Sequence, residues 1–151
     1  MSGLPICTVG HSNRTLEAFA GLLRAAQVRL VVDVRSVPRS RHNPQFNSDA
    51  IEDGLGAHRI GYTRIRELGG LRAASKTVAP DVNGFWIHPG FHHFADYALS
   101  VDFRTGLDRL LGLADERRSA IMCAEAVWWR CHRRIVADYL LLRGREVLHL
   151  M

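Results

Sequence analysis

Residues 119–142 read SAIMCAEAVWWRCHRRIVADYLLL, an apolar run that breaks and then resumes as an amphipathic pattern. The first part predicts a buried strand that ends at Cys123, and the last part predicts a helix that starts at Cys131. The junction between them, residues 123–134, carries two thiols, one carboxylate, one imidazole and three guanidinium groups. We therefore expect any chemistry of the chain at this strand-to-helix junction.

The same succession of strand and helix patterns extends along the rest of the chain. Short β-branched or alternating runs predict four more strands, at residues 6–9, 28–34, 62–68 and 146–150. Apolar residues at helical spacing predict four more helices, at residues 16–26, 48–58, 92–99 and 102–117. The aperiodic residues 71–90 predict a long loop that forms a lid or a binding loop, or that is partly disordered. This order predicts a single α/β domain over residues 1–151, with a three-layer, mainly parallel, five-stranded, Rossmann-like sheet and helices on both faces.

Charge indicates the class of ligand. The chain of 151 residues has a formal charge of +5, and all but one of its 20 basic residues are arginines. Guanidinium groups suit phosphates and carboxylates, so an anionic small molecule or a nucleic acid is the expected partner. Three cysteines without a disulfide spacing and the lack of a membrane-length apolar run predict a cytoplasmic protein with reduced thiols and no membrane contact. We expect no cofactor, and composition does not predict the oligomeric state.

Polar clusters follow three of the predicted strands, at residues 10–13 (GHSN), 33–36 (DVRS) and 123–125 (CAE). In open parallel sheets, ligands bind outside the carboxyl ends of the strands, where the strand order reverses. The three clusters are therefore expected to converge on one cleft.

Short motifs recur in a characteristic order along the chain, at residues 9–15 (VGHSNRT), 32–36 (VDVRS), 38–40 (PRS), 43–46 (NPQF), 68–70 (LGG), 123–125 (CAE) and 131–133 (CHR). On these motifs the chain resembles the domain-of-unknown-function family DUF488. The resemblance implies an α/β fold and a shared site, and it supplies no substrate. Many members of that family have a charged, proline-containing spacer between the two cysteine motifs. This chain has AVWWR at residues 126–130 instead, and its bulky aromatic pair can change what the pocket admits.

Cys123, Glu125 and His132 are the candidate catalytic residues. A helix N-terminus and the cations Arg130 and Arg133 would stabilise a thiolate at Cys123, which makes it the candidate nucleophile. Glu125 is a candidate general acid or a group that orients the substrate, and His132 is a candidate base. In the structural alternative, Cys123 is a small core residue and Glu125 caps a helix.

Helical phase separates the residues that begin the last predicted helix. If the helix starts at Cys131, that residue lies on the apolar face and is expected to pack in the core. His132 lies on the flank of this face, where it can instead hydrogen-bond to Asp33 or to a backbone carbonyl. Arg133 and Arg134 point away and could reach phosphates at the rim of the pocket or remain solvated.

Candidate binding residues surround this junction. The turn after the first strand resembles an anion cradle with free amides, formed by Gly10, His11, Ser12 and Asn13. Asp33 and Arg35 could form a buried ion pair; alternatively, Arg35 binds the anion and Asp33 holds His11. The aperiodic residues 39–47 predict a loop rich in arginine, the cationic loop. The remaining candidates are polar residues of this loop and of the strand-to-helix junction, namely Arg39, Ser40, Arg130 and Arg133.

The leading hypothesis is an enzyme that binds a phosphate- or nucleotide-like anion and acts as a hydrolase or transferase. The alternative is a non-catalytic nucleic-acid-binding or regulatory module, which would use Arg35, Arg39, Arg41, Arg64, Arg66 and Arg72, with stacking by Phe46, Trp86 or Trp128. A redox pair of Cys123 and Cys131 is a further alternative, and a partner-binding domain using Trp128 and Trp129 is another. The spacing of the histidines and cysteines does not match a known metal motif, so no metal is expected.

Overall fold

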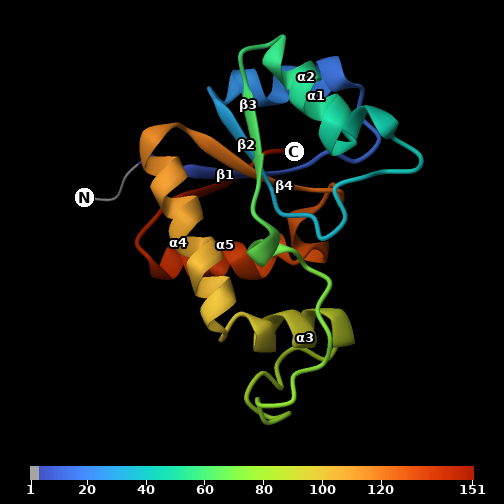
Figure 1. Cartoon of the computed structure of the whole chain (residues 1–151). Coiled ribbons are helices and arrows are strands. Elements are labelled where there is room, and N and C mark those ends of the chain that lie inside the picture. Colours follow the sequence, from blue (N-terminus) through green and yellow to red (C-terminus); the bar gives the residue numbers. More distant parts are fainter. Residues whose placement is uncertain (1–3) are drawn as a thin grey trace.

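The computed structural model describes residues 4–151 as five parallel strands with five helices around them (Figure 1). The strands are β1 (Ile6–Gly10), β2 (Leu30–Asp33), β3 (Gly61–Arg64), β4 (Ser119–Cys123) and β5 (Val147–His149). They pair in the order β3-β2-β4-β1-β5, and every pairing is parallel. The predicted three-layer α/β class is confirmed.

Helices cover both faces of this sheet. They are α1 (Leu16–Ala25), α2 (Ser48–Gly56), α3 (Pro89–Tyr97), α4 (Val101–Glu116) and α5 (Arg133–Leu142). Figure 1 shows α1 and α2 on one side of the sheet and α4 and α5 on the other, with α3 beyond them. The hydroxyl groups of Thr15 and Ser100 accept hydrogen bonds from backbone N–H groups in the first turns of α1 and α4, which fixes where these helices begin.

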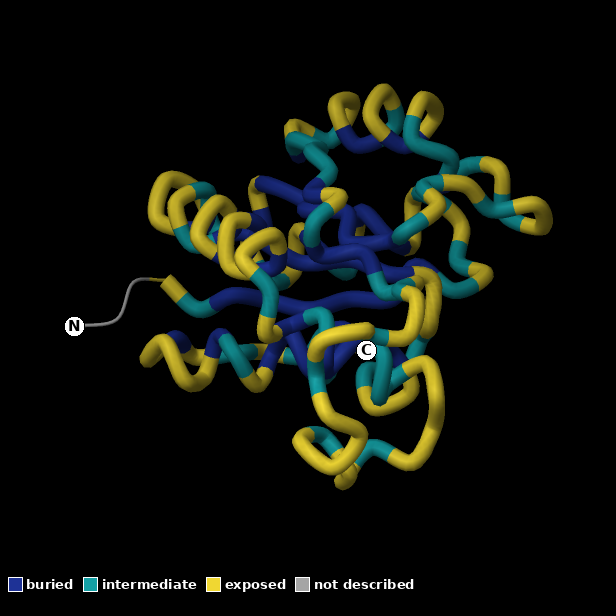
Figure 2. Tube along the Cα trace, turned by 60° about the horizontal axis from the view of Figure 1, so that its bottom comes forward, coloured by how far each residue is buried: buried dark blue, intermediate teal, exposed yellow. Residues whose placement is uncertain are grey.

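Alternate residues of the central strands pack into two separate hydrophobic cores, one on each face of the sheet. Val32 and Ile121 pack with α3, α4 and α5, whereas Val31, Ala120 and Met122 pack with α1 and α2. This division follows from the period of two in a strand, which sends successive side chains to opposite faces. Figure 2 shows the central strands β1, β2 and β4 buried along their length and the outer faces of the helices exposed.

Three predicted boundaries differ from the structure. The third strand ends at Arg64 rather than at residue 68, because the buried Ile65 and Leu68 are three residues apart and lead into a short 3-10 turn, Arg66–Leu68. Helix α3 begins at Pro89, inside the predicted loop, since proline fits the first position of a helix. Helix α5 begins at Arg133, after a 3-10 turn at Trp128–Arg130, so Cys131 precedes the helix.

The strand order places β4 at the centre, between β2 and β1. The chain passes from β1 through α1 to β2, but these two strands are not neighbours in the sheet. The strand β4, which comes later in the sequence, lies between them. The loops that follow β1, β2 and β4 therefore leave the sheet at adjacent carboxyl ends.

Within residues 4–151, no helix has both the length and the apolar composition required to cross a bilayer.

Candidate functional site

The loops that follow β1 and β4 are joined by backbone hydrogen bonds. The N–H of His11 donates to the carbonyl oxygen of Cys123 at 2.9 Å, and the N–H of Ser12 donates to that of Ala124 at 3.0 Å. These bonds extend the β1–β4 pairing beyond the last strand residues. Two of the three polar clusters are thus in direct contact, as their positions at strand ends predict.

Gly10 permits this close approach. A Cβ atom at this position would lie 1.8 Å from the carbonyl oxygen of Glu125 and 2.8 Å from the Cα of Ala126. Both are backbone atoms, which cannot rotate aside as a side chain can. Packing of the two loops therefore requires glycine here, and anion binding by residues 10–13 stays a prediction.

Asp33 and Arg35 form a buried, multiply bonded ion pair. The guanidinium Nη2 of Arg35 lies 2.7 Å from Asp33 Oδ2, and its Nε lies 2.9 Å from Oδ1. Nη2 also donates to the carbonyl oxygen of Phe46 at 2.8 Å, and the hydroxyl of Tyr62 donates to Asp33 Oδ2 at 2.5 Å. Burial and the bond to Asp33 raise the pKa of Tyr62, so its hydroxyl stays a donor. Of the two arrangements that the sequence left open for this pair, the structure has the buried ion pair.

His11 lies behind this ion pair as a neutral imidazole. Its Nδ1 lies 2.8 Å from the carbonyl oxygen of Ser12, and a carbonyl can only accept, so Nδ1 carries the proton. Nε2 then accepts from Nη1 of Arg35 at 3.3 Å. Burial lowers the pKa of His11, and the ring stacks on Phe46 with centroids 4.4 Å apart. His11 therefore supports the position of Arg35.

Cys123, Cys131 and His132 meet at the carboxyl end of β4. The two Sγ atoms lie 2.6 Å apart, and Nδ1 of His132 lies 3.4 Å from Sγ of Cys131. Nε2 of His132 lies 2.8 Å from the carbonyl oxygen of Val34, so this nitrogen donates and Nδ1 presents a lone pair to the thiol. The N–H of Arg133, at the start of α5, donates to Sγ of Cys131 at 3.5 Å. Of the two hydrogen-bond partners predicted for His132, Asp33 and a backbone carbonyl, the structure has the carbonyl.

The pKa values of the two thiols are shifted in opposite directions. The hydrogen bond between the two thiols lowers the pKa of Cys131 to about 5, with smaller contributions from His132 and the N–H of Arg133. The same contact with Cys131, together with burial, raises the pKa of Cys123 well above its ordinary value. Cys131 is therefore the more acidic thiol of the pair.

Arg133 lies beneath this pair, in the interior, so the prediction that it points away to the rim of the pocket or to solvent is wrong. Its side chain is 1% exposed, and its Nη2 donates to the carbonyl oxygens of Glu125 and Ala126 at 3.0 Å each. Within residues 4–151, its Nε and Nη1 have no hydrogen-bond partner. The guanidinium group therefore holds the loop after β4 and supplies a positive charge behind Cys123.

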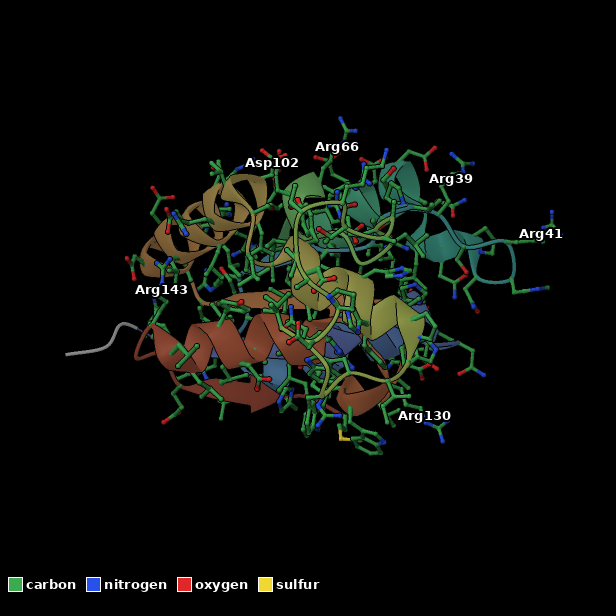
Figure 3. The ribbon with its side chains drawn as sticks, turned by 90° about the horizontal axis from the view of Figure 1, so that it is seen from below. Arg39, Arg41, Arg66, Asp102, Arg130 and Arg143 are labelled. Carbon is green, nitrogen blue, oxygen red and sulfur yellow. The ribbon has the colours of Figure 1, made fainter. Side chains whose placement is uncertain are left out.

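A pocket of about 380 Å³ opens beside the two thiols. Of the predicted site residues, those that line it are Cys123, Glu125, His132, Arg35, Arg39 and Arg130. Arg39 and Arg130 are exposed, and Figure 3 shows them at the same end of the molecule, with Arg143 at the opposite end. The pocket is therefore bordered by two accessible cations, while the charge of Arg35 is balanced by Asp33.

The other predicted binding residues lie outside the pocket lining. Gly10, His11 and Asp33 support it from behind, and Arg133 is buried below it. Ser40 stabilises its own loop, because its N–H donates to Asn47 Oδ1 and its hydroxyl accepts from the N–H of Asn43. Ser12 and Asn13 lie on the turn after β1, also outside the lining. Ligand contacts by any of these residues remain predictions.

Sequence reasoning missed one side of the pocket, which is formed by Gly70, Leu71, His88 and Phe91. A Cβ atom on Gly70 would lie 2.5 Å from Nδ1 of His132, so this glycine lets the imidazole reach Cys131. The LGG motif at residues 68–70 was a usable signal, since it is one of the motifs that carry the family resemblance, but Gly70 was not predicted as a site residue. Leu71 and His88 lie in residues 71–90, which were predicted as a binding loop or lid, but neither was singled out as a site residue, and Phe91 lies just beyond this stretch in the first turn of α3.

The arginines of the nucleic-acid alternative divide into two groups. Arg35 is buried, Arg64 donates to the carbonyl oxygens of Arg35 and Ser36, and Arg72 donates to that of Gly69 and stacks on a tyrosine ring. The exposed members of the set are Arg39, Arg41 and Arg66. Among the proposed stacking residues, Phe46 is buried, Trp86 packs partly buried against the core, and Trp128 already stacks on His149.

Sequence comparison places the chain among known proteins. The family model described as "Domain of unknown function DUF488" matches residues 15–140. Neither a curated protein nor a solved structure matches the chain significantly. The matched range includes β2, β4, the pair of cysteines and the whole pocket lining. The chain therefore belongs to the DUF488 family.

Proposed function

We propose that the chain is an enzyme that binds a phosphate- or nucleotide-like anion and acts on it through a cysteine thiolate, in hydrolysis or group transfer. The observation that carries this proposal is the environment of Cys131. Its Sγ lies 2.6 Å from the thiol of Cys123, 3.4 Å from Nδ1 of His132 and 3.5 Å from the N–H of Arg133. A thiolate beside an imidazole and a helix N-terminus is the usual form of a reactive cysteine.

The geometry favours Cys131 over Cys123 as the nucleophile. The lone pair of His132 Nδ1 faces Cys131 Sγ, so the imidazole can take the thiol proton and remain beside the thiolate as a cation. Cys123 lies deeper, and its raised pKa keeps it protonated. Its role is to donate a hydrogen bond to the thiolate.

Glu125 keeps its role as the candidate acid or orienting group. Glu125 is exposed and lines the pocket, and its backbone carbonyl oxygen accepts a hydrogen bond from Arg133. A carboxylate at the mouth of the pocket can protonate a leaving group or hold a substrate amine or hydroxyl.

Arg39 and Arg130 give the pocket its preference for anions. Both guanidinium groups are exposed at the rim. Between residues 4 and 151, neither forms an ion pair with a carboxylate. They are therefore available to a phosphate or carboxylate, for which the guanidinium fork is suited.

Residue-resolved alkylation tests this proposal without a known substrate. The protein is treated with iodoacetate or with the neutral iodoacetamide, and each cysteine is followed by peptide mass spectrometry. Cys131 should react first, and the fully buried Cys7 should serve as the internal unreactive control. The rate ratio of iodoacetate to iodoacetamide should exceed that of a cysteine peptide, and the double substitution of Arg39→Gln and Arg130→Gln should remove the excess.

Arg41→Gln is the matched control, because Arg41 is exposed on the same cationic loop and lies outside the pocket lining. It should leave the ratio unchanged. If Cys123 reacts and Cys131 does not, the assignment of the nucleophile is wrong. A ratio equal to that of the peptide would contradict the preference for anions.

A further inference from the structure

Cys123 and Cys131 lie close enough together to form a disulfide bond. Their Sγ atoms lie 2.6 Å apart, whereas a disulfide bond measures about 2.05 Å. Cys123 is the last residue of β4, and Cys131 lies between the 3-10 turn Trp128–Arg130 and the start of α5. A bond between the two sulfur atoms requires an approach of only about 0.6 Å.

We infer that these cysteines cycle between a dithiol and a disulfide, and that the chain catalyses thiol–disulfide exchange with a small organic disulfide that carries carboxylate groups. The inference rests on the Cys131 thiolate of the proposed function and specifies what that thiolate attacks.

The two thiols differ in the way that such an exchange requires. Cys131 is the attacking group, because His132 and the N–H of Arg133 stabilise its thiolate. Cys123 is the resolving group: it lies in contact with the attacking sulfur and remains protonated until that sulfur is capped. Arg133, buried beneath the loop after β4, favours ionisation of Cys123 at that stage, because its positive charge lowers the pKa of this thiol.

The pocket indicates the size and charge of the substrate. Its volume of about 380 Å³ far exceeds what a peroxide needs, and both cysteines line it. Apolar walls from Leu71 and Phe91 suit an organic body. Arg39 and Arg130 at the rim suit carboxylates on that body.

The exchange balances in two steps. The Cys131 thiolate attacks one sulfur of the substrate RSSR, forms a mixed disulfide Cys131–S–SR and releases RS⁻, which takes up a proton. Cys123 then loses its proton to solvent and attacks Sγ of Cys131, which releases the second RS⁻ and leaves the Cys123–Cys131 disulfide. The substrate gains two electrons and the protein loses them. A different, more reducing small thiol R′SH restores the dithiol, as two R′SH molecules become R′SSR′.

Glutathione disulfide, which carries carboxylates, is a suitable probe, and hydroxyethyl disulfide is the neutral comparison. The protein is mixed with each probe, the reaction is quenched with acid, and the disulfide linkages are located by peptide mass spectrometry. In the wild type, both halves of glutathione disulfide should be released, and Cys123 should be linked to Cys131. Cys123→Ser should retain one glutathione on Cys131, and Cys131→Ser should form neither product. Cys7→Ser should behave as the wild type does.

Charge selectivity is measured with the same reaction. Glutathione disulfide should react about tenfold faster than hydroxyethyl disulfide, relative to the ratio for a cysteine peptide, which corresponds to about 1.4 kcal/mol. The double substitution of Arg39→Gln and Arg130→Gln should remove this preference, and Arg41→Gln should keep it. Equal ratios for the protein and the peptide would overturn the assignment of an anionic substrate.

The outcomes separate this inference from the proposed function. If excess glutathione disulfide leaves Cys123 and Cys131 of the wild type reduced while Cys131 still reacts rapidly with iodoacetamide, exchange is refuted and the nucleophile stands. A wild-type protein that stops at the mixed disulfide refutes the resolving role of Cys123. If Cys131 reacts with neither reagent, both proposals fail. These readings come from the wild type, so they do not depend on the folding of a variant.

Discussion

Substitution of Gly10 by alanine should destabilise the fold by about 2–6 kcal/mol. The added Cβ would lie 1.8 Å from the carbonyl oxygen of Glu125, and ordinary contact begins at 3.4 Å, so the carbonyl must move by about 1.6 Å. Overpacking of this kind costs about 1–3 kcal/mol. The movement also breaks the hydrogen bond from buried Arg133 to that carbonyl, and an unsatisfied buried donor adds about 1–3 kcal/mol.

Equilibrium unfolding in urea measures this effect, with linear extrapolation to water and with Gly21→Ala as the matched control. Gly21 lies exposed on α1 with nothing within 4 Å of its added Cβ. The control should therefore be stabilised by about 0.5–1 kcal/mol, since alanine favours helices. If the free energies of unfolding of Gly10→Ala and the wild type agree within about 0.5 kcal/mol, the contact between the loops after β1 and β4 is not as described.

Three more substitutions or conditions test the supporting structure. Arg35→Met should lower the free energy of unfolding by about 3–5 kcal/mol, because it leaves Asp33 buried without its partner; urea titration measures this. Gly70→Ala should displace the His132 ring and raise the pKa of the Cys131 thiol towards its ordinary value, as measured by the pH dependence of Cys131 alkylation. The pKa of His11 is lowered by burial, so the unfolded chain binds more protons below pH 6.5. Unfolding free energy should fall as the pH drops through this value, and by less in His11→Asn; equal slopes would contradict the assignment.

The fold was predictable from sequence because its strands and helices carry clear periodicities. The buried run at residues 28–34 and the alternation of strands and helices were enough to predict a parallel three-layer sheet. The strand order follows from packing over long sequence distances and has no local signal. Boundaries failed where a 3-10 turn replaced regular structure, as at Ile65 and Cys131.

The candidate site was predictable only at strand ends. The meeting of the loops at His11 and Cys123 follows from the rule that parallel strands end at one edge. The position of Cys131 did not follow, because helical phase was applied to a residue that has an extended backbone, with φ −128° and ψ 151°. Its contact with Cys123 depends on the path of residues 124–130, for which a single sequence carries no periodic pattern.

The dependence of Cys131 alkylation on pH tests the central claim most directly. A thiol with a pKa of about 5 is roughly 90% thiolate at about pH 6, whereas an ordinary thiol with a pKa of about 8.5 is well under 1% thiolate there. The absolute rate also depends on burial and on the weaker nucleophilicity of an acidic thiol, so the shape of the profile is the informative quantity.

The rate of Cys131 modification by iodoacetamide, measured by peptide mass spectrometry, should therefore be half-maximal near pH 5 and flat above about pH 7. His132→Gln should move the midpoint upward, since it removes the imidazole that faces the thiol. A midpoint near pH 8.5 in the wild type would show an ordinary thiol and would contradict an activated cysteine at this site.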